Sequence, residues 1–168
     1  MHQKISISFS YSIFLPIFVT SDNIALSEVT KNTHMKPEEK ARIIIDRMLN
    51  DAGWEVVDRN HYSPEVSAIA VEEGLLKGNR EADYLLFLNG KAVGVLEAKK
   101  ESVSIYSEFV ADQAEKYTRG VPHWCQAWMN PLPLVYLSNG RELLFRDTRE
   151  VDSEYISLNK IHSPKEIV

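Results

Sequence analysis

Between Pro37 and Gly53 the apolar residues recur at the three- and four-residue spacing of an α-helix. The apolar positions of this run are Ala41, Ile44, Ile45, Met48, Leu49 and Ala52. Pro37 suits a first helical turn, acidic residues follow it at the positive end of the helix dipole, and Gly53 is placed to end the helix. The spacing therefore predicts a helix that packs one apolar face against a core.

The next segments change to short apolar runs that are typical of strands. Trp54 to Val57 predicts a first strand, and Asn60 to Gly78, with Pro64 and two glycines, predicts a loop with irregular structure. Asn89-Gly90 then separates two apolar runs, which is the strongest hairpin signal in the chain. The runs are Asp83–Leu88 and Ala92–Ala98.

The remaining pattern predicts a second helix and a second strand pair. Ser107 to Arg119 is amphipathic, and Leu134–Ser138 and Glu142–Arg146 flank Asn139-Gly140. The tail from Asp147 is polar, which leaves open whether the domain continues beyond this chain. Helix, strands, helix and strands in this order predict an α/β fold with a mixed central sheet flanked by helices.

Composition limits the chain to one domain and disfavours a free-standing DNA binder. The 168 residues, of which 44% are hydrophobic, suit a single core. The net charge is −5 and no dense Lys/Arg tract occurs, so any DNA-acting role fits a catalytic module that other domains deliver to DNA. Cys125 is the only cysteine, which excludes an internal disulfide or a multi-cysteine zinc site and fits a reducing cytoplasm.

The N-terminal residues 1–34 are interpreted as an extension upstream of a start at Met35. The apolar stretch from Ile5 to Val19 contains Pro16 and is too short for a membrane span. It resembles a weak signal peptide, but no convincing small-x-small cleavage site follows it. A secreted protein remains the alternative, disfavoured by the free Cys125. The folded domain proper is therefore expected at residues 35–168.

An acidic and a basic residue extend an apolar face of the second hairpin strand. Side chains alternate along a strand, so Glu97 and Lys99 project to the same face. The same alternation places Val93 and Val95 on that face. Asp83 likewise begins the preceding strand on the face of Leu85 and Phe87. Charged groups at such places are costly unless they are paired or bind something.

This set suits phosphodiester cleavage. Two carboxylates on neighbouring strands can hold Mg²⁺, which stabilises charge and acidifies a bound water. A nearby lysine can orient that water or neutralise charge that develops on the phosphate. We therefore expect Asp83 and Glu97 as metal ligands and Lys99 as the catalytic lysine.

The hypothesis demands a particular hairpin register. A regular two-residue turn at Asn89-Gly90 pairs Asp83 with Leu96, which puts Asp83 and Glu97 on opposite faces. A three-residue loop, or a bulge that uses Gly90, pairs Asp83 with Glu97 or Val95 instead. We therefore predict an odd loop or a bulge.

Three further residues are candidates on the helices. Glu38 shares the inward face of the first helix, whereas Glu39 aligns with Asp46 and Asn50 on the wet side; Glu38 is thus the better third acid, although a simple first-turn acid explains its position equally well. Gln113 and Tyr117 lie one turn apart on the second helix, and spacing alone favours ordinary core packing for this pair.

Four segments follow one another along the chain: Glu38-x-x-x-Arg42 running to Ala52-Gly53-Trp54, Gly78 to Leu86, Gly94 to Lys100, and Gln113 to Tyr117. As an ordered set they resemble the PD-(D/E)XK nuclease superfamily, and more narrowly the N-terminal nuclease domain of type I restriction enzyme R (motor) subunits. The last segment is similar to the Gln-x-x-x-Tyr motif of RecB-like nucleases. Ala82 stands where the superfamily has Pro.

The resemblance implies a restriction-endonuclease-like fold and a Mg²⁺-dependent deoxyribonuclease. It implies Asp83, Glu97 and Glu38 at the metal, Lys99 in catalysis, and Gln113 and Tyr117 near the site or the DNA backbone. It further implies double-stranded DNA and the methylase and specificity subunits as partners, and no membrane. No Gly-x-x-x-x-Gly-Lys-Ser/Thr loop occurs, so the ATP-driven translocase of the full subunit is absent from this chain.

Two alternatives remain open from the sequence. The chain could be a stand-alone RecB-like repair nuclease, or a non-catalytic nuclease fold retained for docking. The intact Asp83, Glu97 and Lys99 argue against the second, because a decayed site would be free to lose them.

Overall fold

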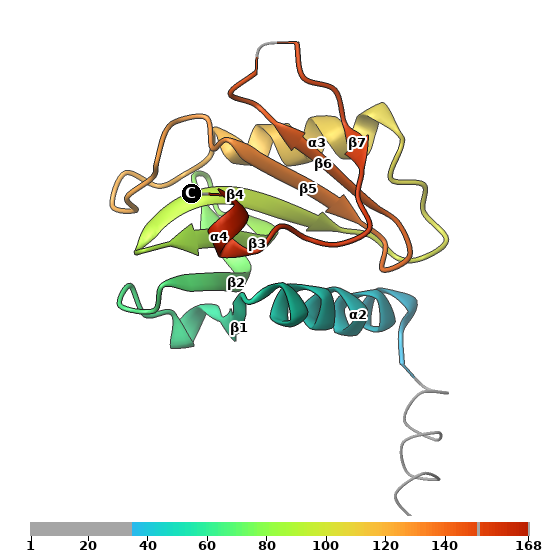
Figure 1. Ribbon diagram of the computed structural model, residues 1–168, viewed down its shortest axis with the longest axis horizontal. Helices are drawn as coiled ribbons and strands as arrows, with labels where there is room; N and C mark the ends of the chain where they lie inside the picture. Colours follow the sequence, from blue (N-terminus) through green and yellow to red (C-terminus); the bar gives the residue numbers. More distant parts are fainter. Residues whose placement is uncertain (1–34, 151, 168) are drawn as a thin grey trace, which may run out of the picture. The chain divides into compact units, whose positions relative to one another are not determined.

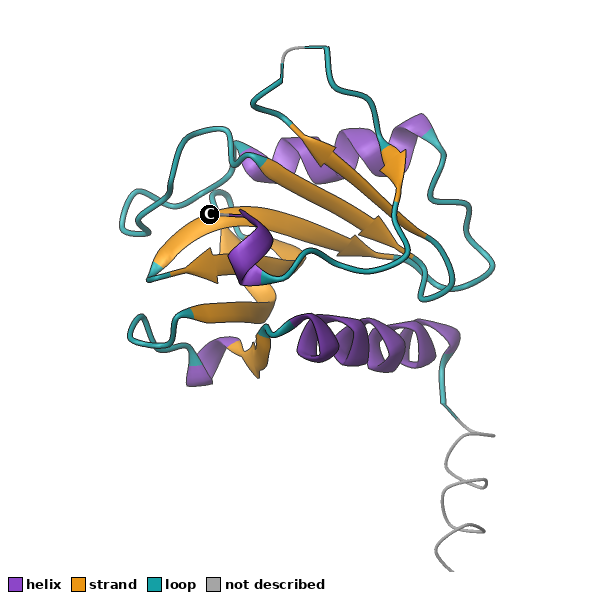
Figure 2. Cartoon of the chain, in the orientation of Figure 1, coloured by secondary structure: helices purple, strands orange, loops and turns teal. Residues whose placement is uncertain are grey.

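The computed structural model describes residues 35–150 and 152–167, and these residues build one mixed sheet with helices on both faces (Figures 1 and 2). Its strands are β1 (Glu55–Asp58), β2 (Ala68–Leu76), β3 (Arg80–Leu88), β4 (Lys91–Ala98), β5 (Leu134–Ser138), β6 (Leu143–Asp147) and β7 (Ile156–Ser157). Its helices are α2 (Pro37–Ala52), α3 (Glu108–Thr118) and α4 (Pro164–Ile167), with a 3-10 turn, η1 (Arg59–His61). Their order and the mixed sheet confirm the predicted α/β class.

The strands lie in the sheet in the order in which they follow in the chain. The pairs β1–β2 and β4–β5 are parallel, and the other neighbours are antiparallel. Helix α3 is the crossover between parallel β4 and β5 and packs on both. A long connection of this kind is what parallel neighbours require.

Each face of the sheet carries its own hydrophobic core. On one face, Val110 and Ala114 of α3 pack on Val95, Val135 and other strand residues. On the other face, Ile45 and Leu49 of α2 pack with Tyr84 and other residues, together with the C-terminal segment. The sheet is therefore a middle layer, and α3 and α4 lie on opposite sides of it in Figure 1.

Helix α2 ends as the sequence predicts. Gly53 adopts φ 96°, the left-handed conformation that glycine tolerates, and its amide donates to the carbonyls of Asn50 and Leu49. The pattern was less accurate for the outer surface of this helix. Ile44 is 42% exposed, and Asp46 is half-buried because it accepts a hydrogen bond of 2.6 Å from the Tyr84 hydroxyl.

The predicted loop from Asn60 to Gly78 is wrong over about half of its length, where the structure has strand β2 (Ala68–Leu76). The first four residues of β2, Ala68–Val71, are buried and pair with β3. Two acidic residues and a glycine interrupt the apolar run, and this hid the strand from a pattern analysis. The polar tail also folds back: Ile161 is 1% exposed, and the Trp54 indole donates to the His162 carbonyl at 2.9 Å.

The interpretation of residues 1–34 as an extension lies outside the described residues. Among the residues that the structure describes, none of the helices has the length and apolar character needed to cross a membrane.

Candidate active site

The hairpin β3–β4 contains the bulge that a shared carboxylate site requires. The turn at Asn89-Gly90 is a regular two-residue turn, with Leu88 opposite Lys91, so the bulge is not at Gly90. The register shifts further along, between Leu86 and Phe87, where Val93 has no partner of its own. Val93 consequently packs with the α2 core, and its predicted place beside Val95 is wrong.

Beyond this bulge the register brings the two acids together. Tyr84 opposite Leu96 is the last pair of this ladder, so the shifted register makes Asp83 and Glu97 the next residues on the two strands, and the charge of Asp83 acts on Glu97. Gly94 follows the bulge at a point where a Cβ would lie 2.5 Å from the Leu134 carbonyl oxygen, and no larger residue fits there. The bulge and the close approach to β5 together fix the register at the site.

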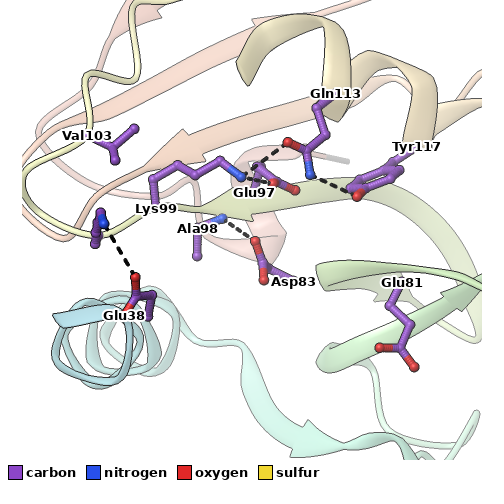
Figure 3. Close-up of a pocket in the computed structure, with 10 residues that line it drawn as sticks. Glu38, Glu81, Asp83, Glu97, Ala98, Lys99, Val103, Gln113 and Tyr117 are labelled. Carbon is purple, nitrogen blue, oxygen red and sulfur yellow. Dashed lines mark hydrogen bonds and ion pairs between the residues drawn. The ribbon is translucent and has the colours of Figure 1, made fainter. Parts of the chain in front are cut away.

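At Asp83 the two hairpin strands separate. Beyond Tyr84, β3 continues beside β2, whereas β4 continues beside β5 as far as Ala98. The Ala98 amide donates to Oδ2 of Asp83 at 2.8 Å. The carboxylate thus replaces the missing strand partner, which places Asp83 in the fork between the strands (Figure 3).

Glu97 is the most deeply buried acid of the site. It is 2% exposed, and its Oε2 atom has no hydrogen-bond partner, while Oε1 pairs with the Lys99 ammonium group. Burial raises the pKa of Glu97 to about 7, the negative charge of Asp83 adds to the rise, and Lys99 opposes it. A carboxylate in this state favours a proton or another cation.

A hydrogen-bonded chain leads from Glu97 to α3. The Lys99 ammonium group donates to Oε1 of Gln113 at 3.2 Å, and Nε2 of Gln113 donates to the Tyr117 hydroxyl at 2.9 Å. Figure 3 shows these side chains directed toward one another from β4 and α3. Gln113 and Tyr117 therefore line the site, rather than only packing in the core as spacing alone favoured.

These residues surround a cavity of about 290 Å³. Its wall consists of Glu38, Glu81, Asp83, Glu97, Ala98, Lys99, Lys100, Val103, Gln113 and Tyr117. Glu38 is at its edge: its side chain is 60% exposed, and its Oε1 atom lies 3.8 Å from the Lys100 ammonium nitrogen. The structure thus brings every predicted residue to one cavity, with Glu38 directed to Lys100 (Figure 3).

Sequence reasoning gave no role to Arg42, which contacts the site from α2. Its Nη2 atom donates to Oδ1 of Asp83 at 2.6 Å. Arg42 follows buried Ala41 and lies at the border of the apolar face of the helix. That position was the available signal, because a charged residue beside an apolar stripe must find a partner near the core.

The cavity offers carboxylate oxygens that a divalent cation could use. Within the described ranges 35–150 and 152–167, His, Cys, Asp and Glu form no cluster of three or more that could hold a metal. Two carboxylates are nevertheless what Mg²⁺ uses when waters and a substrate phosphate complete its shell. The partnerless Glu97 Oε2 atom beside Asp83 supplies one such oxygen, so the donor set fits.

A forked mixed sheet with this arrangement defines the restriction-endonuclease-like class of fold. The chain belongs to the family described as the type I restriction enzyme EcoKI endonuclease subunit second domain, whose profile matches residues 58–168. It is 23% identical over 191 residues to the type I restriction enzyme EcoKI endonuclease subunit of Escherichia coli (strain K12). That alignment covers 84% of this chain but 16% of the relative, so the chain spans a small part of that protein.

A solved structure shares the fold. It is a fragment assigned to the HsdR subunit of a type I restriction enzyme from Vibrio vulnificus YJ016. The TM-score is 0.53 at 21% identity, over 79% of this chain and 24% of that one. The predicted family, a type I restriction enzyme R subunit in its nuclease region, is therefore confirmed.

Proposed function

We propose that this domain is a Mg²⁺-dependent endonuclease of the PD-(D/E)XK type that hydrolyses DNA phosphodiester bonds. The observation that carries the proposal is the fork between β3 and β4, where Asp83 and Glu97 line one cavity with Lys99. Asp83 and Glu97 would hold the cation. Bound Mg²⁺ would supply positive charge for the transition state and acidify a water.

The protein side chains would divide the remaining work. Lys99 is held by Glu97 and Gln113, so its ammonium group is oriented toward the cavity, where it can contact a phosphate or the attacking water. Gln113 and Tyr117 would keep Lys99 in this orientation or contact the DNA backbone. Glu38, whose carboxylate contacts Lys100 at the edge of the cavity, would be an auxiliary acid of the metal site.

The physical argument for catalysis over a purely structural role rests on Glu97. A buried carboxylate oxygen with no partner costs free energy, and a domain that served only for docking would gain stability by replacing it. The family membership supports a place in a type I restriction enzyme rather than a stand-alone repair nuclease.

The proposed partners follow from family and charge. We propose double-stranded DNA as substrate and the methylase and specificity subunits as the assembly that delivers it. The net charge of −5 supports delivery by other subunits, because an acidic domain attracts DNA weakly by itself. ATP would serve only a translocase segment outside this chain.

The test is nicking of supercoiled plasmid DNA by the full chain in Mg²⁺. Asp83→Asn, Glu97→Gln and Lys99→Met keep side-chain size and are each expected to lower the rate at least about 10²-fold. Glu39→Gln is the matched control, since Glu39 lies one residue from Glu38 but does not line the cavity. If the three folded variants nick DNA as fast as wild type, the proposal is wrong.

A further inference from the structure

Glu73 has an unusual backbone conformation beside the site. Among the described residues, Glu73, Asn79 and Asn89 are the non-glycine residues with positive φ. The two asparagines are in turns, where this conformation is common. Glu73 instead adopts φ 50° within β2, where it is strained.

The strain coincides with Asp83 on the neighbouring strand. Glu72 pairs with Tyr84 and Gly74 pairs with Ala82, yet the pair between them, Glu73 with Asp83, is missing from the ladder. Strain of this kind persists when surrounding contacts impose it. The contact that joins these two residues comes from α2.

Arg42 supplies that contact. Its Nη2 atom donates to Oδ1 of Asp83 at 2.6 Å, and its Nη1 atom lies 3.7 Å from Oε1 of Glu73. One guanidinium group therefore links α2 to β2 and β3. Both oxygens of Asp83 accept a hydrogen bond: Oδ1 from Arg42 and Oδ2 from the Ala98 amide.

We propose that Arg42 is a positioning residue that acts as a resident cation on Asp83. It holds the Asp83 carboxylate in the orientation that cleavage needs, and it weakens the binding of a divalent cation to the same carboxylate. This inference rests on the proposed function, because it concerns the cation of that reaction.

Arg42 is proposed to weaken metal binding but to support cleavage, so its removal should change the two quantities in opposite directions. An arginine stays charged at every pH at which the protein is folded. A divalent cation on Asp83 must share the carboxylate with this charge, and the repulsion is worth about tenfold in affinity even when water screens it. Removing the charge should therefore tighten metal binding while loosening Asp83.

The experiment compares the full chain with its Arg42→Gln variant at pH 8, above the pKa of about 7 of Glu97. Mn²⁺ serves as the probe, and its free fraction is measured by electron paramagnetic resonance in the absence of DNA. We expect Mn²⁺ affinity to rise about tenfold. We expect plasmid nicking at saturating Mg²⁺ to fall about tenfold, because Asp83 has lost its support from α2.

Two further variants separate charge from shape and from fold. Arg42→Lys keeps the positive charge but loses the planar guanidinium group, so Mn²⁺ affinity should stay within about twofold of wild type while the nicking rate falls. Arg59→Gln is the matched control: Arg59 pairs at 2.5 Å with Glu81 on the cavity wall, without contact to Asp83 or Glu97. It should leave both measurements unchanged.

Each outcome decides the proposal. Unchanged or weaker Mn²⁺ binding in folded Arg42→Gln overturns it, as does tighter binding in Arg42→Lys. Tighter binding with unchanged nicking overturns the positioning role. If the wild type binds Mn²⁺ and cuts DNA and the Arg42 variants behave in the same way, the proposed function stands and this inference is wrong. If the wild type binds no Mn²⁺, both are wrong.

Discussion

Glu97 and Asn139 are both nearly inaccessible polar residues, with 2% and 3% exposure, yet their hydrogen bonding differs. Oδ1 of Asn139 accepts from the amides of Arg141 and Glu142 at 3.1 and 2.8 Å. Its Nδ2 atom donates to the Val103 carbonyl and to Oε2 of Glu142, both at 3.1 Å. Glu97 keeps one oxygen without any partner.

The two residues lie at the ends of adjacent parallel strands, since Ala98 of β4 pairs with Ser138 of β5. One strand end is closed by a fully bonded turn, and the other leaves a polar atom unsatisfied in a cavity. A satisfied buried group stabilises a fold, whereas an unsatisfied one requires another explanation. The comparison therefore separates a polar residue whose burial is explained by its hydrogen bonds from one whose burial they do not explain.

The largest expected effect is the pH dependence that Glu97 gives to the free energy of unfolding. In the metal-free protein its pKa is about 7 against an ordinary 4.5, so the folded chain binds a proton that the unfolded chain releases. The free energy of unfolding should then fall by on the order of 3 kcal/mol as pH rises from 4.5 to 7. Urea unfolding at several pH values measures this.

The control is Glu97→Gln, which removes the titration. The free energy of unfolding of this variant should not fall between pH 4.5 and 7, so its difference from the wild-type value should change steadily as the pH rises. Equal pH profiles for the two proteins between pH 4.5 and 7 would show that Glu97 titrates normally.

A smaller effect is expected at Asn139. Asn139→Ala removes the acceptor of two amides and the donor to two oxygens, which should lower stability by about 2 kcal/mol and Tm by roughly 8 °C. Differential scanning calorimetry measures it. Nicking per folded molecule should remain as in wild type, and a selective loss of nicking without loss of stability would contradict the structural role.

The smallest effect is expected at Gln113, which sharpens the functional side of the comparison. Gln113→Ala leaves Lys99 bonded to Glu97 alone and should slow nicking about tenfold with little change in Tm. Asp112→Asn, an exposed neighbour on α3, is the control. A nicking rate equal to that of the control would limit Gln113 to packing.

The sequence predicted the elements that carry strong local signals. The Asn89-Gly90 hairpin, the helix ended by Gly53 and the strand pair around Asn139-Gly140 were all found within one or two residues of the predicted bounds, apart from the start of β3. The need for a bulge also followed from chemistry, because two acids on opposite faces could not share a cation.

What the sequence could not supply depends on contacts between distant segments. Gly94 beside Val93 is a local signal, because a glycine inside a strand often marks a bulge or a close backbone approach. Its contact with Leu134 of β5 could not be read from the sequence. Strand β2 was missed because Glu72, Glu73 and Gly74 interrupt its apolar run. Half-buried Glu72 lies near the charges of Asp46 and Arg42 on α2, and exposed Glu73 lies 3.7 Å from Arg42. The role of Arg42 required knowing that α2 packs against the fork.

The sequential strand order has a consequence for folding. Antiparallel β3 and β4 meet across a two-residue turn, so closing this loop costs little entropy, whereas parallel β5 joins β4 only after the long connection through α3. Asp83 and the Ala98 amide are 15 residues apart and can meet as soon as the hairpin forms. Arg42 is 41 residues from Asp83, so undocking of α2 would release its contact while the hairpin stayed intact.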